Sequence, residues 1–307
     1  MILRFFRKFQ TPTPLLLVLV GLILWADALF LADPFNPARI AALAFLIAQA
    51  LYLNHIVTSQ GLIDRQSYYT AVIYLVLMSS DSDMLELHPV LFANFFLMLS
   101  LHQVFRTYKE ETVLVEVFNV GMLIAIAGFF YQPALLLFLF LIISLFVFYY
   151  VDLRSFLAAI LGFATPFFFA ALYFFLTDTL PERIESFSQW IGTMGLPAPR
   201  TSPFTSALLV FLGAACLLAF SRLLFYYIPD KPIRIRKRYR VLIFFLVVAL
   251  LTLFFGHPFR MVHMGLIYLP ISVGLAAYFH LLRSRMLPEL MLTLLLLIIL
   301  ADKWAGF

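Results

Sequence analysis

Long runs of apolar residues, separated by short polar stretches, dominate the chain from residue 15 onward. Each run is apolar around its whole helical circumference, which is typical of helices that contact lipid and one another. A helix needs about 20 residues to cross the hydrocarbon core of a bilayer. The runs that meet or approach this length are residues 15–31, 39–57, 67–80, 89–105, 112–131, 133–151, 156–176, 204–226, 241–256, 261–282 and 287–302. We therefore predict an all-α polytopic transmembrane bundle of about eleven helices, or as few as nine because the third and ninth runs are short.

The composition agrees with a bundle in lipid. The 307 residues are 64% hydrophobic and only 12% charged, whereas soluble domains are roughly half apolar and a quarter charged. A soluble protein of this size leaves about a quarter of its unfolded surface exposed, so it could not hide so many apolar groups. We expect residues 1–307 to form a single integral membrane domain. The first apolar run is followed by bulky and acidic residues rather than a small-residue cleavage site, which favours a retained helix over a signal peptide.

Successive segments that connect these runs are alternately rich and poor in basic residues. With the N-terminus inside, sixteen of the 21 lysines and arginines fall on the inner side, which is the bias expected of a membrane protein. This bias requires all eleven crossings, so we predict that the N-terminus is inside and the C-terminus outside. The net charge of +5 is thereby explained by topology and by contact with membrane lipids, with no nucleic acid involved.

Two connecting segments have features of their own. Residues 177–203 form the largest predicted outer loop, and its apolar residues share one face of a short helix expected to lie in the membrane interface. Residues 227–240 are rich in lysine and arginine and are predicted to be a basic cytoplasmic loop. This loop is interpreted mainly as an orientation determinant that touches anionic headgroups, with a dedicated protein-docking or lipid-binding site as the alternative.

The stretch "SSDSDMLELHP", residues 79–89, is an acidic interruption between two apolar runs. The carboxylates of Asp81 and Asp83 are two residues apart in a predicted turn and can reach one divalent cation, with His88 as a further ligand or as an acid/base. Hard cations such as Mg²⁺ or Mn²⁺ prefer such oxygen ligands. The structural alternative is a solvated loop whose aspartates and serines cap helices.

Two further groups of polar residues are predicted on the same outer side. Asp27 lies near the outer end of the first apolar run, where burial of a charge is costly and often indicates function. Asp33 follows the run and precedes a proline, so it could simply begin a turn. His257, Arg260 and His263 lie at the outer start of the tenth run, where they could bind an anionic phosphate group. The alternative is that they extend to the interface or pair with acidic residues of neighbouring loops.

Taken together, these features resemble the GT-C superfamily of integral-membrane glycosyltransferases. Its acidic motifs in the first two outer loops match Asp27 with Asp33, and Asp81 with Asp83. "RMVHMGLIYLPISVGLAAY", residues 260–278, resembles a late helix of that superfamily. The resemblance implies transfer of a sugar from a polyprenyl-phosphate-linked donor, with Asp27 or Asp33 as catalytic base. It also implies that Asp81, Asp83 and His88 hold a cation and that the 257–263 group binds the leaving phosphate.

The chain also resembles an uncharacterised family of bacterial multi-pass proteins, through "HPVLFANFFLMLSLHQVFRTYK" (88–109) and "FFYQPALL" (129–136). That resemblance implies the bacterial inner membrane but no activity. The outer loops are shorter than those of GT-C enzymes, so the alternative function is a non-catalytic subunit or scaffold of an envelope or secretion complex, with membrane-protein partners. A transporter or flippase is the third hypothesis, which the lack of charges at the centre of the membrane disfavours.

Overall fold

The computed structural model describes most of the chain. The described residues are 13–26, 28–29, 36–63, 67–80, 82–107, 113–148, 152–192, 203–255, 261–282 and 286–305. They contain helices and no β-strand, which confirms the all-α prediction. Clustering of contacts divides them into two compact units, each built from stretches that are far apart in the sequence.

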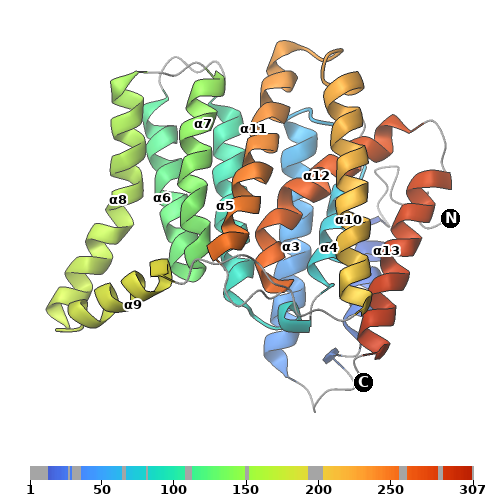
Figure 1. The fold of residues 1–307 in the computed structure, drawn as a ribbon, viewed down its shortest axis with the longest axis horizontal. Coiled ribbons are helices and arrows are strands. Elements are labelled where there is room, and N and C mark those ends of the chain that lie inside the picture. Colours follow the sequence, from blue (N-terminus) through green and yellow to red (C-terminus); the bar gives the residue numbers. More distant parts are fainter. Residues whose placement is uncertain are drawn as a thin grey trace. The chain divides into compact units, whose positions relative to one another are not determined.

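Unit 1 comprises residues 1–88, 200–236 and 268–307. Its elements are α2 (Thr13–Leu24), α3 (Pro37–Ser59), α4 (Tyr69–Met78), the 3-10 helix η2 (Ser82–Leu85), α10 (Pro203–Arg222), the π-helical turn η4 (Leu223–Tyr227), most of α12 (Gly265–Leu281) and α13 (Met286–Ala305). In Figure 1 these helices run from blue through orange to red, and α10 lies beside α13.

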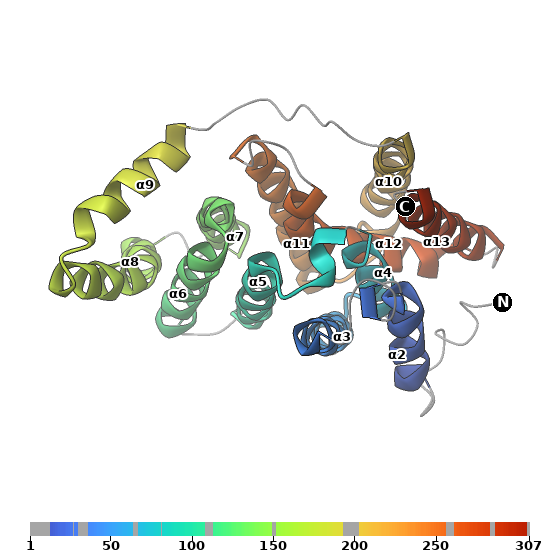
Figure 2. The same ribbon diagram turned by 90° about the horizontal axis from the view of Figure 1, so that it is seen from below.

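Unit 2 comprises residues 89–199 and 237–267. Its elements are α5 (Pro89–Arg106), α6 (Leu114–Phe130), η3 (Gln132–Leu137), α7 (Phe138–Phe148), α8 (Leu153–Leu176), α9 (Leu180–Gly192), most of α11 (Ile233–Leu251), η5 (Thr252–Phe255) and η6 (Met261–Met264). Helices α5, α6 and α8 lie side by side (Figure 1). Figure 2 shows α9 extending sideways from the end of α8.

Every one of the eleven predicted apolar segments contains a helix. Among the described residues, five helical segments are long and apolar enough to cross a membrane: residues 37–59, 153–176, 206–227, 233–255 and 262–281. The protein is therefore a membrane protein. Other apolar helices are shorter, such as the ten-residue α4, so eleven crossings and the orientation stay predictions.

Helix ends are fixed by local sequence. Asn36 caps α3, its Oδ1 accepting a hydrogen bond from the backbone N–H of Ala38 at 3.0 Å, and Pro37 opens the helix with the backbone angle that a first turn needs. At the other end of α3, Gly61 adopts a φ of 67°, and the next backbone N–H donates to the carbonyl of Val57. This is the Schellman arrangement, and glycine adopts its left-handed conformation without strain.

The basic segment differs from its prediction. Helix α11 begins at Ile233, so most of the predicted 227–240 loop is the first two turns of a helix. Lys237 and Arg238 are buried there, and Arg238 donates from Nη2 to the carbonyl of Phe105, the penultimate residue of α5, at 2.9 Å. Lysine and arginine are good helix formers, and a guanidinium satisfies a carbonyl that the end of α5 leaves free.

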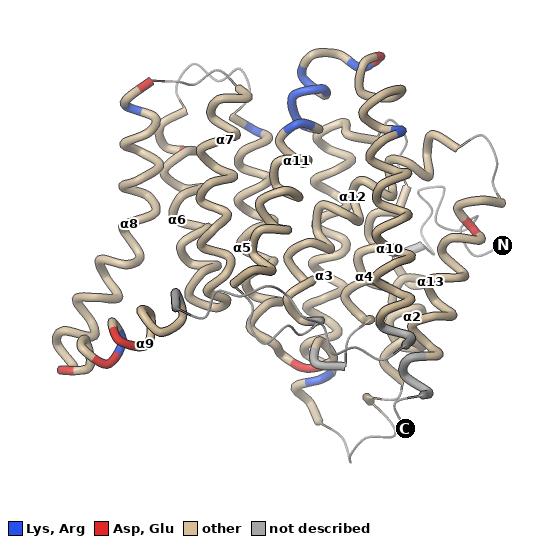
Figure 3. The backbone as a smooth tube through the Cα atoms, in the orientation of Figure 1, with Lys and Arg blue, Asp and Glu red and all other residues tan. Residues whose placement is uncertain are grey.

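Charged residues of unit 2 gather at both ends of α8. Asp152 and Arg154 lie at its start, whereas Asp178, Glu182, Arg183 and Glu185 lie beyond its last turn. Figure 3 shows red and blue together at the start of α8, and red with blue along α9. The acidic residues are thus in excess at the end of α8 that leads into α9.

Candidate functional site

Two segments that the sequence singled out as acidic are hydrogen-bonded to each other in unit 1. Trp25, fully buried beyond the end of α2, donates from its indole Nε1 to the hydroxyl of Ser79 at 2.9 Å. Ser79 ends α4, and its hydroxyl donates to the carbonyl of Leu75 at 2.7 Å. Both polar groups are thus satisfied inside the protein, as burial demands.

Arg39 adds a second tie between the same segments. From the first turn of α3, its Nη1 donates to the carbonyl of Ala28 at 2.9 Å and its Nη2 to Oε1 of Glu86 at 3.0 Å. The side chain of Arg39 is 17% exposed and that of Glu86 is 59% exposed. The ion pair alone contributes little, because solvent screens it, but the fork of the guanidinium fixes the two segments in one geometry. We call Trp25, Ala28, Arg39, Ser79 and Glu86 the junction.

One hydrogen-bond donor of the junction is not used by the described residues. The Nε atom of Arg39 is buried and has no hydrogen-bond partner among the described residues. A buried guanidinium N–H without an acceptor carries a desolvation cost, so an anionic group that reached it would gain a charge-assisted hydrogen bond.

The predicted acidic site residues lie around this junction in sequence. Asp27, Asp33 and Asp81 lie outside the described residues, and so does the side chain of Asp83. Asp27 comes two residues after Trp25, and Asp81 comes two residues after Ser79. The structure therefore joins the immediate neighbours of the predicted base and of the predicted metal ligand.

His88 is described and half-buried, between η2 and the start of α5. Its backbone N–H donates to the carbonyl of Glu86 at 2.7 Å. Within the part of the chain that the structure describes, no three histidine, cysteine, aspartate or glutamate side chains gather as metal ligands do. Because the predicted partners of His88 fall outside that part, the cation site stays a prediction.

The third predicted group belongs to unit 2. His257 and Arg260 lie outside the described residues. His263 lies in η6, where its Nδ1 forms a hydrogen bond with the hydroxyl of Tyr131. The two rings also stack, with centroids 5.9 Å apart. His263 thus joins the last elements of unit 2 to the end of α6, which gives it a structural role whatever else it binds.

Sequence reasoning gave no role to Trp25, Ser79 or Arg39. Trp25 lies inside an apolar run, Ser79 only opens the polar stretch 79–89, and Arg39 was only one of the outer basic residues. The signal that could have found them is a tryptophan, a serine and an arginine that each lie next to an acidic segment at a helix end. A further tie of the same kind joins the hydroxyls of Ser80 and Tyr268, 3.3 Å apart.

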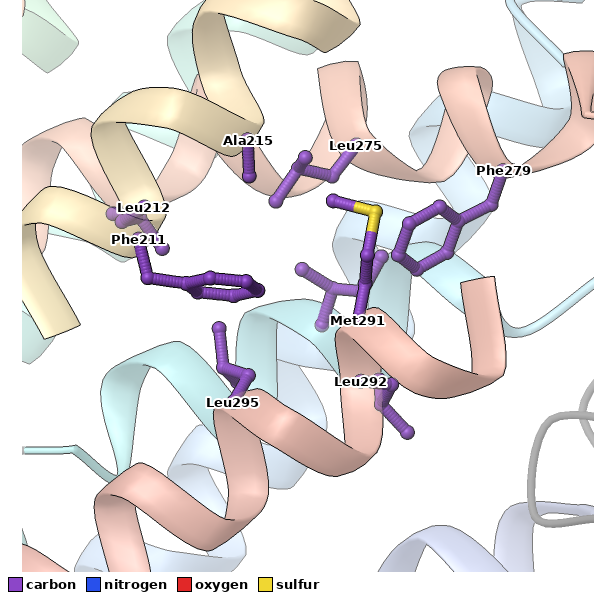
Figure 4. Close-up of a pocket in the computed structure, with 9 residues that line it drawn as sticks. Phe211, Leu212, Ala215, Leu275, Phe279, Met291, Leu292 and Leu295 are labelled. Carbon is purple, nitrogen blue, oxygen red and sulfur yellow. The ribbon is translucent and has the colours of Figure 1, made fainter. Parts of the chain in front are cut away.

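Unit 1 also contains a small cavity between α4, α10, α12 and α13. Its lining is apolar, and Figure 4 shows Phe211 and Phe279 facing it from α10 and α12. The cavity volume of about 20 Å³ is room for one water-sized sphere. The residues that line it are all apolar, so the structure gives no sign of a polar ligand there.

The sequence profile of DUF6427, a family of unknown function, matches residues 3–305. The chain belongs to the DUF6427 family. This agrees with the resemblance to an uncharacterised family, and it covers both units. A search of curated proteins and a search of solved structures found no match, so the resemblance to GT-C enzymes receives no support from either.

Proposed function

We propose that this membrane protein transfers a sugar from a polyprenyl-phosphate-linked donor at the outer face of the bacterial inner membrane, as GT-C enzymes do. Asp27 or Asp33 is the general base, and Asp81 and Asp83 with His88 hold a divalent cation such as Mg²⁺ or Mn²⁺. His257, Arg260 and His263 bind the phosphate of the donor.

The observation that carries the proposal is the junction. The Trp25–Ser79 hydrogen bond and the Arg39 fork tie the two segments that hold the predicted base and the predicted cation ligands. Pre-organised polar groups on helix ends are what a reaction at a membrane surface needs, because the lipid substrate itself cannot leave the bilayer. The Nε donor of Arg39, which has no partner among the described residues, also supports the proposal, because it could bind an anionic substrate.

In the proposed transfer, each bond that forms is matched by one that breaks. The aspartate takes the proton of an acceptor hydroxyl, whose oxygen forms a bond to the anomeric carbon of the sugar. The bond from that carbon to the phosphate oxygen breaks, and the polyprenyl phosphate leaves with the electron pair. Arg260 and His263 would stabilise the developing phosphate charge, and Asp81, Asp83 and His88 would hold a divalent cation that positions the sugar.

The test compares matched aspartate-to-asparagine changes. Asp27→Asn and Asp33→Asn, each made alone in the full-length protein, are expected to leave insertion intact, and the change at the catalytic position should abolish glycan formation. Asp178→Asn is the control, because Asp178 lies in unit 2 with a φ of 55°, a conformation that asparagine also adopts readily. Surface glycans are compared by gel mobility and mass spectrometry at equal protein levels. Normal glycan in both Asp27 and Asp33 variants would remove the catalytic proposal.

A second candidate is a non-catalytic subunit of an envelope complex, and the exposure of α8 favours it. Of the 24 residues of α8, only Ser155, Ala159 and Gly162 are buried. Many of its other residues are exposed, among them Leu161, Phe168 and Phe175, and can contact lipid or another membrane protein. This candidate predicts a stoichiometric partner after mild detergent extraction, together with tolerance of all three asparagine variants.

A further inference from the structure

Unit 2 contains a cavity of about 340 Å³, and none of the junction residues lines it. Its walls are the end of α6 with η3, the second half of α8, and α9. The residues that line it are Gly128, Phe129, Gln132, Leu135, Phe167, Ala170, Ala171, Phe174, Leu180, Arg183, Ile184, Ser186 and Phe187. Small-molecule sites occupy roughly 300–1,000 Å³, so this cavity has room for a small ligand or for part of a larger one.

The residues that line the cavity are mostly apolar, with a few polar groups. Arg183 is the only charged residue among the described residues that line the cavity, and Gln132 and Ser186 are the polar ones. The other ten are apolar or glycine. Glu182 and Glu185 neighbour Arg183 in sequence but do not line the cavity, and Glu185 accepts a hydrogen bond from Gln189 on the next turn. An anion in the cavity would therefore meet a cation and no carboxylate.

Arg183 is held at the corner where α9 leaves α8. Its guanidinium lies 5.2 Å from the ring centroid of Phe174, in a cation–π contact. Asp178, in the turn between the two helices, adopts a φ of 55°, and the far end of α9 is anchored by Trp190, whose ring centroid lies 5.8 Å from that of Phe255. Both ends of α9 are thus fixed, so the cavity is a feature of the folded unit.

The surroundings of the cavity decide what fills it. Only 11% of the most apolar stretch of α8 is buried, so this helix presents its side chains to hydrocarbon. Helix α9 is amphipathic, with apolar residues such as Ile184 and Phe187 toward the cavity and exposed Glu182 and Glu185. A ligand there must be apolar where α8 forms the wall and anionic where Arg183 lies, which is the character of a membrane lipid at its interface.

We propose that this cavity binds one phospholipid, with its phosphodiester on Arg183 and the upper part of one acyl chain against Ala170, Ala171 and Phe174. Gln132 and Ser186 provide further polar contacts for the headgroup. The site involves none of the aspartates of the proposed reaction and stands whether or not the protein is an enzyme.

The experiment uses the full-length protein in detergent and native mass spectrometry. Dioleoyl phosphatidylglycerol is titrated, and dioleoylglycerol, which has the same chains without phosphate, is titrated in parallel. We expect one saturable phosphatidylglycerol per chain. Arg183→Gln should weaken it about tenfold or more, since a charge-assisted hydrogen bond contributes about 1.5–3 kcal/mol. Arg154→Gln, the same change on an exposed arginine at the opposite end of α8, should leave the affinity unchanged.

A second pair of variants tests the cavity itself. Ala171→Leu fills the wall and should weaken phosphatidylglycerol binding, whereas Ala164→Leu, on α8 outside the lining, should not. Equal binding by the Arg183 and Arg154 variants would overturn the proposal, as would equal affinity for dioleoylglycerol or binding that never saturates. Displacement of the lipid by inorganic phosphate would also overturn it, because the site would then be one for a free anion.

Discussion

The contact between α6 and α8 is close enough that a single methyl group should disrupt it. A Cβ atom added to Gly162 would lie 2.0 Å from the carbonyl oxygen of Phe118, and contacts below 3.4 Å are already tighter than nine in ten real ones. To restore an ordinary contact of 3.4 Å, the helices would have to separate by about 1.4 Å along this direction. A gap of about 0.5–1 Å forfeits a quarter to a half of the van der Waals attraction of the atoms involved.

The cost cannot be recovered elsewhere. Between membrane helices the hydrophobic effect gives no attraction, so close packing of small residues supplies much of the association energy. Gly162→Ala should therefore lower the free energy of unfolding by about 1–3 kcal/mol, the usual cost of overpacking. This loss outweighs the gain of about 0.5–1 kcal/mol that alanine brings to a helix interior.

Two other glycines make the test selective. Gly213 in α10 has no atom within 4 Å of an added Cβ, so Gly213→Ala should leave the protein equally stable or slightly more stable. At Gly128 the obstacle is the flexible side chain of Leu135, which can move, so Gly128→Ala should have an intermediate effect. Unfolding is measured by titration of mixed micelles with SDS, followed by circular dichroism. Equal stability of the Gly162 and Gly213 variants would refute the argument.

Three smaller predictions concern helix ends and buried polar groups. Gly61→Ala should destabilise by about 1 kcal/mol through backbone strain alone, because nothing lies within 4 Å of an added Cβ, and the same SDS titration measures it. Ser79→Ala leaves the indole N–H of Trp25 buried without its acceptor and should cost about 1–3 kcal/mol, whereas unchanged stability would mean that this bond does not hold the junction. The hydroxyl and backbone N–H of Ser155 lower the pKa of the Asp152 carboxyl, which caps α8. The stabilisation is complete above the ordinary carboxyl pKa and is lost as the pH falls through the lowered value, a dependence that Asp152→Asn should remove in unfolding curves recorded from neutral to acidic pH.

The positions of the helices were available from the sequence. Each apolar run became a helix because, in lipid, every backbone polar group must be satisfied within its own segment. The short helix in the 177–203 segment was predicted from its spacing of apolar residues, and α9 occupies Leu180–Gly192. Its location in the interface stays a prediction, as do the count of crossings and the orientation.

Helix boundaries were predicted less well. The predicted segment 241–256 lacks the first two turns of α11, because the basic residues from Ile233 onward were assigned to a loop. Composition alone suggests that charged residues lie outside a helix that enters the membrane. The burial of Arg238 against the end of α5 depends on a residue 133 positions away, which no local pattern contains.

The partner of each helix was decided only by the tertiary structure. A helix that is apolar on every side carries no stripe to say which face meets protein, so periodicity could not pair α6 with α8. What pairs them is shape, since Gly121 and Gly162 let the two backbones approach. The junction arises in the same way, from a tryptophan and a serine that are 54 residues apart. The sequence by itself determined that the chain is helical, lies in a membrane and carries acidic segments between its helices. Which of these segments meet was decided by small residues and a few buried hydrogen bonds, because only close contact in three dimensions gives such groups their energy.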